Sequence, residues 1–136
     1  MTRAFIDASA LVPMAVPTDQ WRGHLLAAMQ RLRGPAPLRM VTSNWTLYEA
    51  LALAQRREKR RALELFRLIE QGAEIVTVDA AIEEEALRRF LRWKDKSASV
   101  VDHANTLVAA REGCDVILSF DADFVPLAAA AGIALA

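Results

Sequence analysis

Short apolar runs typical of strands alternate with helical patterns along this 136-residue chain. We expect strands at residues 3–6, 38–42, 75–78 and 116–119, and a last one around Ile133. The expected helices cover 18–33, 44–55, 58–71, 80–93 and 100–112, and a small helix falls in the tail 127–136. This alternation predicts an α/β fold with a mostly parallel sheet of four to five strands covered on both faces by helices.

The size and the apolar content are those of one domain, residues 1–136, with a buried core. Although 54% of the residues are hydrophobic, no stretch approaches the ~18 apolar residues of a membrane span. The first residues do not read as a signal peptide, and Cys114 is the only cysteine, which excludes an internal disulfide. We therefore expect a cytoplasmic protein with no membrane partner.

The charges balance, with 17 basic and 17 acidic residues, which argues against a protein that coats nucleic acid generally. Two stretches are nevertheless dense in basic residues. The first contains Arg56, Arg57, Lys59, Arg60 and Arg61, and the second contains Arg88, Arg89, Arg92, Lys94 and Lys96. Such clusters are able to bind RNA phosphates, but they are equally typical of solvated helix faces, and the first also suits an acidic partner segment.

Acidic residues follow the first and the fourth expected strands directly. Asp7 comes after the run Ala4-Phe5-Ile6, and Asp121 comes after the run 116–120. Ligands of open parallel sheets bind beyond the carboxyl ends of the strands, so both acids are expected in that crevice. For Asp7, a helix cap is an alternative interpretation. Asp79 also follows a strand, but it starts a long helix, and N-capping explains it without chemistry.

Two further acids lie inside apolar helical patterns. Glu49 has Tyr48, Leu51 and Ala52 near it, which predicts a largely apolar helix face; a capping box from Thr46 is the alternative. Asp102 stands three residues after Ser99 and so fits a capping box as well. The two roles of Asp102 are compatible, since a helix start favours an anion. His103 is interpreted as a surface or hydrogen-bonded core histidine and not as a base.

The four acids gain meaning as a set. Two like charges ~4 Å apart repel each other by about 4 kcal/mol at an effective dielectric constant of ~20. A divalent cation removes this conflict, and ligation by oxygen alone suits Mg²⁺ or Mn²⁺. Asp7, Glu49, Asp102 and Asp121 are therefore the candidate metal ligands and catalytic residues. Ser9 and Asp123 are candidate supporting residues, although each also fits a turn or a cap.

The motifs around these acids resemble those of the PIN-domain nuclease family, and most of all its VapC-type toxins. The resemblance rests on four segments in this order: Phe5-Ile6-Asp7-Ala8-Ser9-Ala10-Leu11, Thr42-Ser43 with Leu47-Tyr48-Glu49, Ser99-Val100-Val101-Asp102, and Leu118-Ser119-Phe120-Asp121-Ala122-Asp123-Phe124. It implies a three-layer α/β/α fold and a Mg²⁺- or Mn²⁺-dependent endoribonuclease, usually a homodimer. In a toxin–antitoxin pair, the antitoxin would thread a segment across the active site.

The resemblance also places Asp7, Glu49, Asp102 and Asp121 at the positions of the family's acidic ligands, with Ser9 and Asp123 where supporting residues often stand. An RNA-processing nuclease without an antitoxin remains an alternative. A receiver-like or flavodoxin-like binding module is less favoured, because a receiver needs a late lysine and the last one here is Lys96. A haloacid-dehalogenase-type phosphatase would need a second aspartate where Ser9 stands.

Overall fold

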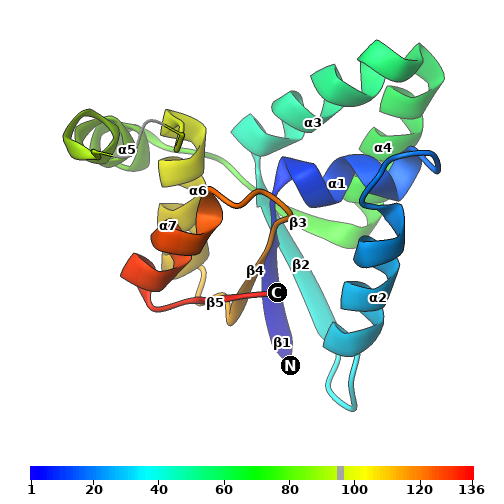
Figure 1. The fold of residues 1–136 in the computed structure, drawn as a ribbon, viewed down its shortest axis with the longest axis horizontal. Helices are drawn as coiled ribbons and strands as arrows, with labels where there is room; N and C mark the ends of the chain where they lie inside the picture. The colour runs from blue at the N-terminus through cyan, green and yellow to red at the C-terminus, as the bar shows by residue number, and fades with distance from the viewer. Residues whose placement is uncertain (95–96) are drawn as a thin grey trace.

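Five parallel strands form the centre of the protein in the computed structural model, which describes residues 1–94 and 97–136 (Figure 1). Lys96, counted above in the second basic cluster, lies outside the described residues. The strands run in the order β3-β2-β1-β4-β5, and every neighbouring pair is parallel. Their bounds are β1 Thr2–Ile6, β2 Leu38–Ser43, β3 Ala73–Val76, β4 Val116–Leu118 and β5 Ala134–Leu135.

Helices cover both faces of this sheet, so the fold is the predicted three-layer α/β/α arrangement. Figure 1 shows four helices on one side, with bounds α1 Ala8–Ala15, α2 Arg22–Leu32, α3 Asn44–Arg57 and α4 Lys59–Gly72. The other side carries α5 Ala80–Arg92, α6 Val100–Arg111 and α7 Phe124–Ala131. None of the described helices is long and apolar enough to cross a membrane.

The central strand β1 shows why both faces must be covered. Ala4 and Ile6 belong to the core beneath α1–α4, whereas Phe5 belongs to the core beneath α5–α7, and all three are fully buried. Successive side chains of a strand point to opposite faces, so an unbroken apolar run fits only a strand that is buried twice. The sheet therefore separates two hydrophobic layers.

The register brings the carboxyl ends of β1, β2 and β4 to one edge. Ile6 pairs with Leu118, and the amide of Asp7 continues the ladder by donating to the carbonyl of Leu118 over 3.0 Å. Phe5 pairs with Val41, so Ser43 at the end of β2 reaches the same level as Asp7. The residues that follow these strands are consequently neighbours, although the sequence separates Asp7 from Ser119 by 112 positions.

Several expected boundaries are wrong. The strand expected at 75–78 is Ala73–Val76, because Val78 donates its amide to the side chain of Asn44 over 2.8 Å instead of continuing the ladder. The last strand begins after Ile133, whose amide closes the end of α7 by donating to Ala128. The helix expected at 18–33 is shorter, and helix α1 was not expected as a separate element.

Candidate active site

Asp7 lies where β1 passes into α1, and it is both a helix cap and a member of an acidic cluster. Its side chain accepts the amide of Ser9 at the start of α1, as the capping interpretation predicted. The same oxygen, Oδ2, accepts the hydroxyls of Ser9 and Ser119, each over 2.9 Å. Asp7 is only 5% exposed, so these donors replace the water that a buried carboxylate has lost. Capping and site formation are therefore compatible.

Asp102 stands in the first turn of α6 and is buried. The predicted capping box is present: Ser99 Oγ accepts the amide of Asp102 over 3.1 Å, and Asp102 Oδ2 accepts the amide of Ser99 over 2.9 Å. This box fixes the carboxylate against the helix start and occupies one of its two oxygens. The other oxygen keeps its ligand capacity.

Glu49 is on α3, and the argument that predicted its position is wrong. The sequence predicted a buried apolar helix face, but Glu49 is exposed, and the neighbouring Tyr48 and Leu53 are 62% and 37% exposed. The capping box with Thr46 is also absent, because α3 begins at Asn44 and is capped by Ser43. What relates Glu49 to the other acids is its place one and a half turns into a helix that starts at the same sheet edge.

Asp121 and Asp123 lie in the turn between β4 and α7. Asp121 Oδ1 accepts the amide of Asp123 over 2.9 Å and so shapes the turn, whereas the side chain of Asp123 makes no cap hydrogen bond. One carboxylate oxygen each of Asp102, Asp121 and Asp123 lie within 4.8 Å of one another. The structure thus brings Asp123, expected only to support the site, into contact range of two of the four principal candidates.

Burial and mutual repulsion make these acids hard to ionise together. Although Glu49 is exposed as a residue, its carboxyl group is partly shielded from water. This loss of water, and then the charges of Asp7, Asp102 and Asp121, raise its pKa to about 7. Burial raises the pKa of Asp102 to about 6, although the hydrogen bond from the Ser99 amide opposes it. Burial is also the main cause that raises the pKa of Asp121. Within residues 1–94 and 97–136, no lysine or arginine forms an ion pair with any of these carboxylates.

The oxygen ligands fit a hard divalent cation. Ligands of an octahedral Mg²⁺ are about 3.0 to 4.2 Å apart, and the three aspartate oxygens lie within 4.8 Å of one another, so they are near enough to share one cation. The thiol of Cys114 does not compete as a metal ligand. Cys114 is buried, and burial raises the pKa of its thiol to about 11. The donor set therefore suits Mg²⁺ or Mn²⁺ and not a thiolate-bound metal.

Sequence reasoning missed two polar residues beside Asp7. Ser119 donates to Asp7 and accepts the amide of Asp121 over 3.1 Å, so it ties the two strand ends together. Asn105 on α6 is fully buried, with its Nδ2 3.4 Å from Asp7 Oδ1. A signal for Ser119 existed, since it directly follows β4 just as Asp7 follows β1. The sequence carried no signal for Asn105, because one asparagine in a helical pattern does not reveal which residues its side chain contacts.

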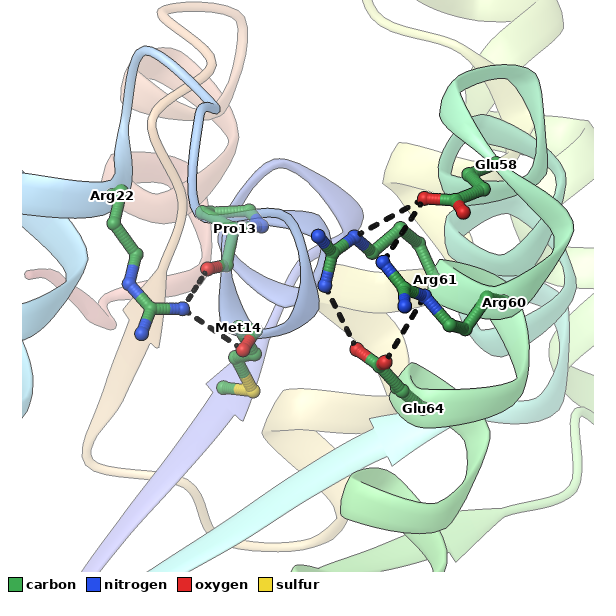
Figure 2. Close-up of polar contacts among 7 residues, drawn as sticks. All are labelled: Pro13, Met14, Arg22, Glu58, Arg60, Arg61 and Glu64. Atoms are coloured by element: carbon green, nitrogen blue, oxygen red, sulfur yellow. Dashed lines mark hydrogen bonds and ion pairs between the residues drawn. The ribbon is translucent and has the colours of Figure 1, made fainter.

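The first basic cluster is partly neutralised by its own acids (Figure 2). Arg60 and Arg61 both reach Glu58 and Glu64, and the shortest contact joins Arg61 Nη1 to Glu64 Oε2 over 3.2 Å. Arg56, Arg57 and Lys59 are exposed and have no ion-pair partner among the described residues. The available positive charge is therefore at the end of α3 and the start of α4.

His103 points away from the acids. It is 2% exposed, its ring packs edge-on against Trp93 at 5.2 Å, and its Nε2 has no hydrogen-bond partner among the described residues. Burial is the main cause that lowers the pKa of His103, so the imidazole is neutral. The interpretation as a non-catalytic residue agrees with this position, but the expected hydrogen bond is not found.

A hollow lies away from the acidic cluster. A groove of about 690 Å³ between α2 and α4 is lined mainly by apolar side chains, among them Leu25, Leu26, Met29 and Leu68. At its edge Arg22 donates to the carbonyls of Pro13 and Met14 over 2.7 and 2.9 Å (Figure 2). None of the described residues that line this groove is a carboxylate, so the acidic edge of the sheet is the candidate site for a cation.

Comparison with known proteins identifies this architecture. The model of the PIN domain family matches residues 4–130, so the chain belongs to the PIN domain family. No curated protein matches it significantly.

Solved structures give the same fold. VapC20 from Mycobacterium tuberculosis, a toxin that cleaves the sarcin–ricin loop, is 28% identical over 96% of this chain and 95% of that one, with a TM-score of 0.77. FitAcB from Neisseria gonorrhoeae is 17% identical over 97% and 95% of the two chains, with a TM-score of 0.62. VapBC2 from Rickettsia felis, solved on a DNA fragment from its promoter, is 11% identical over 99% and 98%, with a TM-score of 0.65. At these last two identities the likeness concerns the fold alone.

Proposed function

We propose that this protein is a metal-dependent endoribonuclease that acts as the toxin of a toxin–antitoxin pair. The observation that supports it most is the convergence of carboxylates from β1, α6 and the β4–α7 turn, without a cationic partner among the described residues, at one edge of a PIN-domain sheet. The similarity to VapC20, which cleaves RNA, supports RNA as the substrate.

The proposed catalytic and metal-binding residues are Asp7, Glu49, Asp102 and Asp121, with Asp123 and Ser9 in support. When bound, Mg²⁺ or Mn²⁺ would supply an activated water and neutralise charge on the phosphate. The protein contributes the fixed oxygens: Ser9 and Ser119 hold one oxygen of Asp7, and the capping box holds one oxygen of Asp102. Because each of these carboxylates keeps a second oxygen free of those bonds, the cluster is arranged in advance to receive a cation.

Binding of the RNA would use positive charge outside the cluster. We assign this role to the exposed Arg56, Arg57 and Lys59, whereas Arg60 and Arg61 are already paired with glutamates. The proposal includes a cognate antitoxin and a homodimer working on cytoplasmic RNA. Growth arrest on expression, relieved by an antitoxin encoded beside the gene, separates the toxin from an RNA-processing nuclease, which would cleave RNA without such a partner.

The test compares two Asp→Asn variants at equivalent places in the fold. Asp7 and Asp79 both cap helices that follow a strand or its extension, but only Asp7 faces the acidic cluster. We expect Asp7→Asn to abolish Mg²⁺-dependent cleavage of RNA and growth inhibition while circular dichroism stays that of the parent. Asp79→Asn, in which asparagine still caps α5, keeps both activities. Full toxicity in a folded Asp7→Asn variant would contradict the proposal.

A further inference from the structure

Asn105 stands between the central acid of the site and the start of α3. It is completely buried, and its Oδ1 accepts the hydroxyl of Thr46 over 2.6 Å and that of Ser43 over 3.4 Å. Its Nδ2 faces Asp7 Oδ1 at 3.4 Å. We propose that Asn105 is a positioning residue that orients Asp7 for the cation. This inference rests on the function proposed above.

The surroundings of the amide allow only one orientation. The short contact to Thr46 needs an acceptor, because the Thr46 hydroxyl has no other hydrogen-bond acceptor among the described residues. A flipped amide would place its oxygen against Asp7 Oδ1, and two acceptors repel each other. Thr46 therefore sets Asn105, and Asn105 presents a donor to Asp7.

The donor of Asn105 matters because the other strong hydrogen bonds to Asp7 all go to Oδ2 and not to Oδ1. Ser9 and Ser119 both bind Oδ2, which leaves Oδ1 with Asn105 alone among the described residues. The bonds to Oδ2 already restrain rotation about the Cβ–Cγ bond, and a donor to Oδ1 restrains it further. With the donor in place, one lone pair of Oδ1 is occupied and the second has a defined direction, which is how outer partners orient metal ligands.

The same residue joins the two helices that carry Glu49 and Asp102. Asn105 is one turn beyond Asp102 on α6, and Thr46 is three residues before Glu49 on α3. The Thr46–Asn105–Asp7 chain thus fixes the spacing between α3, α6 and the end of β1. An error in this spacing would displace three candidate ligands at once.

Mn²⁺ binding, followed by electron paramagnetic resonance, tests the proposal on three variants of the full chain. Asn105→Ala removes the donor, and we expect a loss of about tenfold in Mn²⁺ affinity. Thr46→Val keeps the shape but releases Asn105, and we expect a smaller loss of a few-fold. Thr106→Val is the matched control: Thr106 is also buried on α6, but its hydroxyl binds only the backbone carbonyl of Asp102 within the helix, so affinity stays within about twofold of the parent.

RNA cleavage by the same variants separates positioning from substrate binding. We expect kcat to fall and KM to stay unchanged in Asn105→Ala, since no contact to RNA is removed. Parent-like Mn²⁺ affinity in Asn105→Ala, or an equal loss in Thr46→Val and Thr106→Val, overturns the proposal. If Asn105→Ala does not fold, Thr46→Val against Thr106→Val decides alone. Asp7→Asn tells the two failures apart: if it too binds Mn²⁺ and cleaves RNA normally, the proposed function is wrong, and otherwise only the role of Asn105 is.

Discussion

At the scale of single residues, the acidic cluster is a balance between burial and charge. Glu49 and Asp102 have pKa values raised to about 7 and about 6, and that of Asp121 is raised as well. Each of these groups binds its proton more tightly in the folded protein than in the unfolded chain. Without a cation, the folded state therefore favours partly protonated acids.

This balance predicts how stability depends on pH in the metal-free protein. A carboxyl with a raised pKa stabilises the fold fully below its unfolded pKa, near 4, and loses that contribution as pH rises through its folded pKa. We expect the melting temperature in EDTA to fall between about pH 4.5 and 7. Glu49→Gln should flatten this slope. The lowered pKa values of Asp79 and Glu85 act mainly below this window. The lowered pKa of His103 acts within the window and opposes the fall, because its contribution to stability grows as pH rises through its unfolded pKa.

Thermal unfolding of the parent and of Glu49→Gln, each with EDTA and with Mn²⁺, checks this expectation. Binding of a cation requires deprotonated ligands, so the stabilisation by Mn²⁺ should grow as pH rises. A melting temperature in EDTA that rises steadily from pH 4.5 to 7 would show that the acids do not repel one another in the folded protein.

The sequence predicted which acids come together only where the order of strands determines their position. Asp7 and Asp121 follow strands, and parallel strands end at one edge, so their proximity could be derived from the sequence. Glu49 was selected by an argument about an apolar face that proved wrong, because Tyr48 beside it is largely exposed. Asn105 and Ser119 were missed, since hydrogen bonds between distant segments leave no local pattern.

At the scale of elements, the helix caps and the site use the same atoms. Asp7 caps α1, Ser43 caps α3, and Ser99 with Asp102 caps α6, and all three caps lie at the carboxyl edge of the sheet. The N-termini of these three helices present their positive dipole ends to that edge, which favours anions there. This explains how several carboxylates persist in one place before any cation arrives.

The capping box of α6 predicts that the hydroxyl group of Ser99 stabilises the protein. Ser99→Ala should cost about 1 kcal/mol of stability, because the amide of Asp102 loses its acceptor. It should also loosen the helix turn that carries the Asp102 carboxylate, although the backbone amide of residue 99 can still donate to that carboxylate. Ser99→Thr, which keeps the hydroxyl, should behave as the parent. Urea unfolding and Mn²⁺ titration measure the two effects, and equal stability of Ser99→Ala and Ser99→Thr would contradict the role of the box.

The element boundaries that failed did so for tertiary reasons. β3 lies two residues earlier than its apolar run suggested, because it pairs from Ala73 with Met40 and the chain then leaves to reach Asn44. Neither partner is visible from the local sequence. By contrast, the caps at Asp79 and Ser99 were predicted correctly, because a cap is a contact over three residues.

At the scale of the whole molecule, the sheet divides the protein into two cores that share one cooperative fold. Leu65 of α4 is buried in the first core, and Leu127 of α7 is buried in the second. We expect Leu65→Ala and Leu127→Ala each to cost about 2–5 kcal/mol, and the double variant to show the sum, since the layers do not touch at these positions.

Urea denaturation followed by both circular dichroism and tryptophan fluorescence tests this view of the cores. The two probes should give coincident single transitions in the parent and in every variant. Separate transitions, with one layer unfolding first, would mean that the sheet does not couple the layers, and the proposed metal site between them would then depend on one layer alone.

The central place of β1 determines how late in synthesis the acidic cluster can assemble. β1 is made before β4, with which it pairs, and the acids that follow these two strands are 114 positions apart, from Asp7 to Asp121. At about 5–20 residues per second, a ribosome needs roughly 6 to 23 seconds to synthesise that interval. A growing chain therefore carries Asp7 and Glu49 well before Asp102 and Asp121, and under the proposed function it cannot cleave RNA until Asp121 has been made.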